Sequence, residues 1–137
     1  METVKIKSPI DGSIYAERPV ATDQQVNAAV ESARAAQADW ARVPAAERAH
    51  YALKMLEALT GMADEIVPEL AWQMGRPVRY GGEFGGVKER TTYMVEIAEK
   101  ALAPVMASNP KDAFKRYVKK EPLGVVMVIA PWNYPYL

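Results

Sequence analysis

The 137-residue sequence contains no cysteine and a single histidine, His50. The absence of cysteine excludes disulfides, thiolate metal sites and a cysteine nucleophile within these residues. One histidine gives a histidine-based metal site too few ligands, so we predict no metal site. A Ser/His/Asp triad would have to use His50, for which the sequence suggests no acidic or hydroxyl partner, and we predict a structural role for it.

An excess of charge of either sign is also missing, because 17 basic residues face 17 acidic ones. A net charge of zero gives no field that would attract nucleic acid or an anionic membrane, and we predict neither as a partner. The longest apolar run, residues 125–132, is shorter than the roughly 18 to 20 residues that span a bilayer. The first residues lack the pattern of a secretory signal, so a cytoplasmic location is predicted.

The first three quarters of the sequence predict a β-hairpin followed by four helices. Alternating apolar residues on both sides of the turn Ser8-Pro9-Ile10-Asp11-Gly12 predict the hairpin over roughly residues 3–18. Thr22 and Gln25 have the spacing of a capping box and begin a helix of about 18 residues. Apolar spacings of three and four predict further helices from Pro44 to before Gly61, at about residues 63–74, and from 84 to before Pro104. Trp40 and Trp72 are predicted to be buried anchors.

The final quarter changes from helical to extended character. Residues 114–120 are basic and alternate, which is typical of an edge strand. Residues 123–130, LGVVMVIA, are β-branched without alternation, which predicts a strand covered on both faces in a parallel sheet. Such a strand needs neighbouring strands that this sequence does not supply. The predicted class is a helix-rich α+β chain with an N-terminal hairpin, four helices and terminal strands.

The strongest chemical signal is PWNYP at residues 131–135, directly after the predicted strand. Ligands of open α/β sheets bind beyond the carboxyl ends of the strands, so a polar group at this position can reach them. Asn133 carries an uncharged NH2 donor, which suits the stabilisation of a developing oxyanion. The alternative, which the spacing leaves open, is that Asn133 only bonds the backbone of a turn.

A glycine-rich turn, residues 81–86, lacks the GxGxxG pattern and follows a predicted helix instead of a strand. We therefore predict that these glycines either allow close helix packing or loosen the start of the fourth predicted helix, and we predict no phosphate site. Glu83, within this turn, is predicted to pair with Arg76 or Arg79.

Four stretches make the chain resemble the aldehyde dehydrogenase superfamily over essentially its whole length. They are SPIDGSIYAERPVAT, ARAAQADWARVPAAERA, ELAWQMGRPVRYGGEFGGV and the ending EPLGVVMVIAPWNYPYL. The resemblance implies that this is the N-terminal part of an α/β enzyme, within its Rossmann-like cofactor-binding domain. It also implies that residues 112–121 belong to an oligomerisation arm, and that the enzyme is a homo-oligomer.

The resemblance assigns site residues only near the end of the chain. It implies that the Asn133 amide forms part of the oxyanion hole and that Tyr134 lies in the substrate tunnel. It also implies that the nicotinamide side of the cofactor cleft is lined by Ile129, Ala130, Pro131 and Trp132.

The implied reaction oxidises an aldehyde to a carboxylic acid with NAD or NADP, through a thiohemiacetal on a cysteine. The catalytic cysteine, the water-activating glutamate, the catalytic domain and most of the cofactor site are not among these residues, so we expect the 137 residues alone to be inactive. Two alternatives stay open. One is a non-catalytic binding or assembly module that uses an exposed strand edge. The other is a superfamily relative that makes an acyl-CoA or reduces an acyl phosphate.

Overall fold

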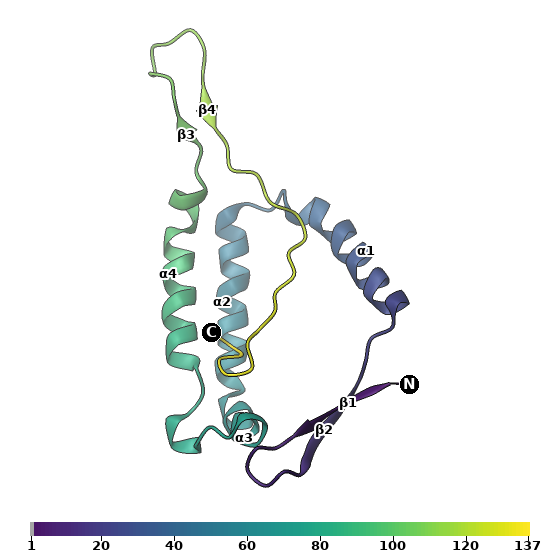
Figure 1. The fold of residues 1–137 in the computed structure, drawn as a ribbon. Coiled ribbons are helices and arrows are strands. Elements are labelled where there is room, and N and C mark those ends of the chain that lie inside the picture. The colour runs from purple at the N-terminus through teal and green to yellow at the C-terminus, as the bar shows by residue number, and fades with distance from the viewer. Residues whose placement is uncertain (1) are drawn as a thin grey trace.

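The computed structural model describes residues 2–137, and within them four α-helices are accompanied by two small antiparallel hairpins (Figure 1). The elements are β1 (Thr3–Lys7), β2 (Ile14–Pro19), α1 (Asp23–Trp40), α2 (Ala45–Gly61), α3 (Ala63–Met74), the 3-10 helix η1 (Val78–Tyr80), α4 (Phe84–Leu102), β3 (Val105–Met106) and β4 (Tyr117–Val118). The predicted helix-rich α+β class, the N-terminal hairpin and the four helices are confirmed.

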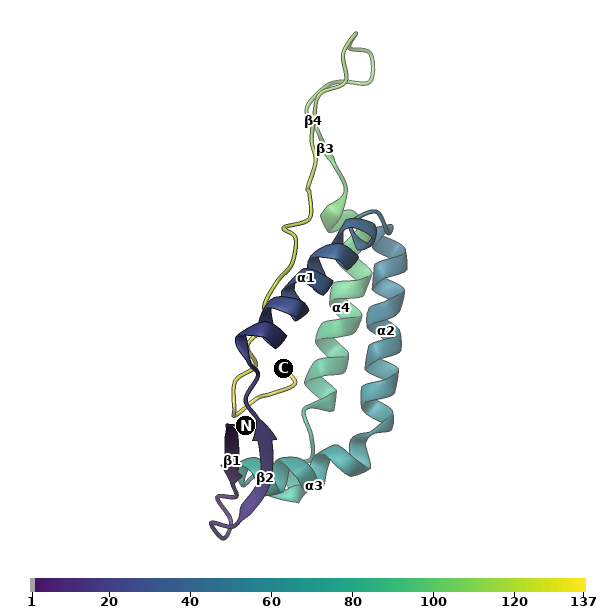
Figure 2. The same cartoon turned by 90° about the vertical axis from the view of Figure 1, so that its right-hand side faces the viewer.

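The centre of the fold is the antiparallel pair α2 and α4, with α3 lying across one end of it (Figures 1 and 2). The buried apolar side chains come from these three helices: Leu56, Ile66, Leu70 and Val87. The core therefore lies at the end of the bundle from which the glycine-rich turn leads into α4.

The N-terminal hairpin is fixed to the same end of the bundle. Ser8, in the turn after β1, is fully buried, and its backbone NH donates to the carbonyl of Ser13 over 2.8 Å. Gly75 ends α3 in the left-handed region, at φ 75°, which favours glycine. A Cβ atom on Gly75 would lie 3.2 Å from Cγ of Pro9, so the hairpin turn lies directly against the end of α3.

Helix α1 leans away from α2 and α4, and none of its residues is buried. Its predicted capping box is present: Oγ1 of Thr22 accepts from the NH of Gln25, and Oε1 of Gln25 accepts from the NH of Thr22. Trp40 and Trp72 are 44% and 43% exposed, so the prediction that they are buried anchors is wrong. Helical spacing identifies an apolar face, but it does not show that another element covers that face.

The strands β3 and β4 pair at the base of a long arm that projects beyond the helices (Figure 1). Of the predicted edge strand at residues 114–120, only Tyr117 and Val118 are in strand conformation. Phe114, near the end of the arm, is 75% exposed.

Residues 123–130 are the main departure from the predicted secondary structure. They run beside α1 as an extended segment without strand pairing to any of residues 2–137. Leu123 and Val128 are 96% and 85% exposed, so the predicted buried strand is wrong for this chain. A strand needs a partner for its backbone NH and carbonyl groups, and the described residues offer none at this position.

Candidate functional site

The segment after residue 130 turns back toward the start of α4 and carries most of the predicted site residues. Ile129 and Trp132 are each 79% exposed, and Ala130, Pro131 and Asn133 are exposed as well. The chain then bends so that Pro135 and Tyr136 become half-buried against the helices. The predicted cofactor residues therefore form a continuous exposed stretch, while the residues after Asn133 are anchored.

Glu83 provides the centre of this anchor. It is the residue before α4, and its side chain is 2% exposed. One carboxylate oxygen, Oε1, accepts from Nη1 of Arg76 over 2.9 Å. The other, Oε2, accepts from the backbone NH groups of Tyr136 over 2.8 Å and Leu137 over 3.1 Å. The buried carboxylate thus has both a counter-charge and donors for both oxygens, which a buried charge requires.

Arg76 extends the anchor to Asn133 itself. Its Nη2 atom donates to the backbone carbonyl of Asn133 over 2.8 Å, while Nη1 bonds Glu83. Its guanidinium carbon lies 5.2 Å from the ring centroid of Tyr134, a cation–π distance. The planar fork of arginine allows these three contacts at once, which a lysine ammonium cannot reproduce.

Local sequence explains why Arg76 and Glu83 come together. Gly75 ends α3 in a left-handed conformation, Pro77 prevents its continuation, and η1 forms a single tight turn. Gly81, at φ 62°, then redirects the chain into Glu83 and α4. The predicted pairing of Glu83 is confirmed for Arg76, whereas Arg79 donates to the hydroxyl of Tyr80.

Two of the four glycines of this turn lie where a side chain would meet a neighbour, whereas an added Cβ atom on Gly81 or Gly85 would have nothing within 4 Å. A Cβ atom on Gly82 would lie 2.1 Å from the Phe84 ring, and one on Gly86 would lie 2.9 Å from Cδ2 of Leu137. Side chains larger than hydrogen at these positions would displace their neighbours.

Tyr136 lies close to two carboxylates in this anchor. Burial raises the pKa of its phenol, and the negative charges of Glu69 and Glu83 raise it further. The phenol is therefore held neutral over a wider range of pH than a tyrosine in water.

The side chain of Asn133 takes no part in these bonds. It is exposed, and no hydrogen bond within residues 2–137 uses its amide group; only its backbone carbonyl is bonded. The turn-bonding alternative therefore finds no support in this structure. The arrangement is a neutral amide donor on a main chain that is fixed by an ion pair.

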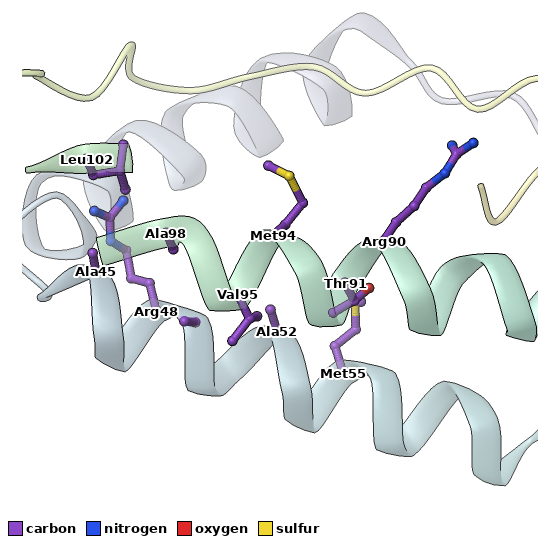
Figure 3. Close-up of a pocket in the computed structure, with 11 residues that line it drawn as sticks. Ala45, Arg48, Ala52, Met55, Arg90, Thr91, Met94, Val95, Ala98 and Leu102 are labelled. Carbon is purple, nitrogen blue, oxygen red and sulfur yellow. The ribbon is translucent and has the colours of Figure 1, made fainter. Parts of the chain in front are cut away.

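A second concave region is the groove of about 410 Å³ between α2 and α4. Figure 3 shows Ala52, Val95 and Ala98 along its floor, with Arg48 at one end and Arg90 projecting from α4 away from α2. No acid, base or nucleophile lines it apart from the hydroxyl of Thr91. The groove is therefore not the candidate site.

In the described part of the chain no group of three or more metal-binding side chains occurs, and no helix is long and apolar enough to cross a membrane.

Sequence patterns located Asn133 and Glu83 but missed the contact between their segments. Backbone NH groups of Tyr136 and Leu137 leave no trace in a side-chain pattern, and 53 residues separate Tyr136 from Glu83. The one available signal was the pair of opposite charges at Arg76 and Glu83, of which Glu83 lies within the glycine-rich turn.

Comparison with known proteins decides the family. All of residues 1–137 match the model of the aldehyde dehydrogenase family. The chain belongs to this family. A peroxisomal aminoaldehyde dehydrogenase from Malus domestica is 35% identical to it over 142 residues, which cover 98% of this chain and 28% of that protein. A D-glyceraldehyde dehydrogenase (NADP+) from Picrophilus torridus is 31% identical over 98% of this chain and 27% of its own length. This chain therefore spans between a quarter and a third of such relatives.

Solved aldehyde dehydrogenase structures have the same fold over nearly all of the chain. A P. syringae indole-3-acetaldehyde dehydrogenase in complex with NAD+ superposes with a TM-score of 0.84 at 31% identity, covering 98% of this chain and 28% of that one. An NAD-dependent benzaldehyde dehydrogenase from Corynebacterium glutamicum gives a TM-score of 0.84 at 30% identity, covering 98% and 29%. The family assignment thus holds in sequence and in fold.

Proposed function

We propose that residues 1–137 are the N-terminal part of the cofactor-binding domain of an NAD(P)-dependent aldehyde dehydrogenase, and that Asn133 contributes to its oxyanion hole. One observation carries the proposal. The Asn133 amide is exposed and makes no hydrogen bond within residues 2–137, while Arg76 fixes the Asn133 backbone. Anchoring of the Asn133 backbone fixes the place from which its amide can donate, and stabilisation of an oxyanion uses a donor that is positioned in advance.

In the proposed reaction, a cysteine thiolate adds to the aldehyde carbon, and the carbonyl oxygen becomes negatively charged in a thiohemiacetal. The Asn133 NH2 group donates to that oxygen without changing its own charge. Loss of one such donor typically lowers the rate by about 10²- to 10³-fold. Because residues 1–137 contain no cysteine, we propose that the thiolate comes from polypeptide outside them. By resemblance to the family, the glutamate that activates water is also proposed to lie outside them. We propose that the 137 residues alone do not turn over an aldehyde.

The names of the structural relatives support a nicotinamide cofactor, since one is in complex with NAD+ and another is NAD-dependent. A nicotinamide cofactor bound here would supply the hydride acceptor for the oxidation. Residues 129–132 are proposed to line one wall of its cleft, because their exposed backbone can make main-chain contacts. Tyr134, stacked on Arg76 beside Asn133, is proposed to line the path of the substrate.

The arm of β3 and β4 is proposed to mediate homo-oligomer formation. Its support is the projection of the arm beyond the helices and the exposure of Phe114, Tyr117 and Val118. A cytoplasmic location is a separate proposal from sequence; the names of the relatives include peroxisomal and chloroplastic enzymes.

The second candidate function is an assembly module that adds its extended segment to the sheet of another protein. The observation that favours it is the exposure of the apolar residues 123–130 without strand pairing in the described chain. Addition of a strand to a sheet needs such unpaired backbone groups.

One experiment separates these functions. The coding sequence is read past codon 137, and the complete open reading frame is expressed and assayed for NAD(P)H formation with a panel of aldehydes. The enzyme proposal expects a frame that continues to a cysteine and gives turnover, with none from the 137-residue chain. A stop codon after Leu137, or turnover by the pure 137-residue chain, would contradict it.

A further inference from the structure

Asn133 lies in a segment with few other attachments to the fold. From residue 123 to residue 132 the chain forms no helix or strand, bends at Val125 and Trp132, and is exposed apart from Gly124. The first strong attachment is the bond from Arg76 to the Asn133 carbonyl, followed by the bonds from Tyr136 and Leu137 to Glu83. The position of Asn133 relative to the helices is therefore set by two side chains that are distant from it in sequence.

We infer that Arg76 and Glu83 are positioning residues for Asn133: their ion pair holds the backbone of residues 133–137 so that the Asn133 amide meets the developing oxyanion. This inference rests on the proposed function of Asn133. Neither Arg76 nor Glu83 is assigned a contact with substrate or cofactor; both act through the asparagine.

Glu83 and Arg76 bond different parts of the segment that contains Asn133. Glu83 fixes the chain after the asparagine, because its Oε2 accepts from Tyr136 and Leu137. Arg76 fixes the asparagine itself, because one guanidinium nitrogen bonds the Asn133 carbonyl while the other bonds Glu83. Both side chains are largely shielded from water, at 15% and 2% exposed, so solvent screens their attraction little.

The ion pair also explains why a buried carboxylate stands at the start of α4. Glu83 alone would be an uncompensated buried charge, and Arg76 alone could bond the Asn133 carbonyl but would have no fixed orientation. Together they form the anchor, an ion pair that joins the end of α3 to the start of α4. A shift of about 1 Å in a catalytic group can lower a rate by about 10²-fold. The reaction rate should therefore depend on how this anchor places the Asn133 amide.

The kinetic test uses the complete open reading frame with Arg76→Lys, Glu83→Gln and the matched control Arg79→Lys. Lysine keeps the charge of Arg76 but loses the fork and the stacking on Tyr134. Both Arg76→Lys and Glu83→Gln are expected to lower kcat and kcat/KM equally, by about tenfold to a hundredfold, with KM unchanged. The double variant should be about as slow as the slower single variant, because both changes break one unit. Arg79→Lys should leave kcat unchanged, since Arg79 contacts Tyr80.

A structural test on the protein expressed from the complete open reading frame is independent of activity. Amide hydrogen exchange at Tyr136 and Leu137 should accelerate about tenfold or more in Glu83→Gln, which loses the charge-assisted bonds. It should change much less in Arg76→Lys, which leaves the Glu83 acceptor in place. If the two residues had only a structural role, both variants would show faster amide exchange and lower thermal stability together. Their KM values would then change as well.

The outcomes separate the two proposals. If the unsubstituted protein oxidises aldehydes but Arg76→Lys and Glu83→Gln keep the kcat of Arg79→Lys, the positioning inference is wrong and the proposed function stands. If the unsubstituted protein is inactive although Tyr136 and Leu137 are protected, the proposed function is wrong, and the catalytic part of the inference is wrong with it. Unprotected amides at Tyr136 and Leu137 in the unsubstituted protein would contradict the hydrogen bonds to Glu83 on which the inference rests.

Discussion

Gly85 and Gly86 are neighbours in the first turn of α4, yet an added methyl group would meet different surroundings at each. A Cβ atom on Gly85 would have nothing within 4 Å, whereas one on Gly86 would lie 2.9 Å and 3.3 Å from the two Cδ atoms of Leu137. Both glycines have ordinary backbone angles, because neither is among the glycines with positive φ. Gly85→Ala is therefore a matched control for Gly86→Ala.

The expected magnitudes follow from two opposing effects. Alanine stabilises a helix position by roughly 0.5–1 kcal/mol relative to glycine, and both variants gain this. Gly86→Ala also overpacks against Leu137. Because Leu137 is partly exposed and its side chain can rotate, the cost lies near the lower end of the range for overpacking, about 1 kcal/mol. Gly85→Ala should be more stable than the unsubstituted chain, and Gly86→Ala about equal to it.

The assay is urea unfolding of both variants, followed by far-UV circular dichroism, with amide exchange at Leu137 as a local readout. Exchange at Leu137 should be faster in Gly86→Ala than in Gly85→Ala, since the displaced side chain disturbs the bond to Glu83. Equal stabilisation by the two alanines, with equal exchange, would refute the contact between the start of α4 and the terminal segment.

Three further predictions concern the core, the first helix and the terminal segment. Leu70→Ala should lower the free energy of unfolding by about 2–5 kcal/mol in urea titrations, because Leu70 is 4% exposed within a small core; a loss below that range would contradict its central place. Thr22→Ala should cost about 1 kcal/mol in the same assay through loss of the capping box, and no loss would show that α1 does not depend on it. The raised pKa of Tyr136 stabilises the docked segment below the ordinary tyrosine pKa of about 10, and this contribution is lost as pH rises through the folded value. Amide exchange at Leu137, corrected for intrinsic rates, should accelerate as the pH rises above the ordinary tyrosine pKa in the unsubstituted chain but not in Tyr136→Phe.

Local signals in the sequence were sufficient for the helices and the hairpin. The capping box at Thr22 and Gln25, the apolar spacing of α2 to α4 and the turn at residues 8–12 act over a few residues, so each could be interpreted without knowing the fold. The failures concern what covers an apolar surface. Residues 123–130 have the composition of a buried strand, but burial and pairing depend on neighbours outside the segment.

The candidate site divides in the same way. Asn133 could be singled out because its chemistry and its place after an apolar run are both visible in sequence. The pair of Arg76 and Glu83 was one of two suggested pairings, and only the structure decided between Arg76 and Arg79. The bonds from Tyr136 and Leu137 to Glu83 involve backbone donors, which every residue except proline possesses, so composition could not reveal them.

The most direct test of the central claim is the kcat of Asn133→Ala in the complete open reading frame, with Asn27→Ala, a change at an exposed position of α1, as the control. The account predicts that Asn133→Ala lowers kcat by about 10²- to 10³-fold while the KM values for aldehyde and cofactor stay nearly constant. Asn27→Ala should keep the full rate. A kcat for Asn133→Ala equal to that of the control would contradict the assignment of Asn133 to the oxyanion hole.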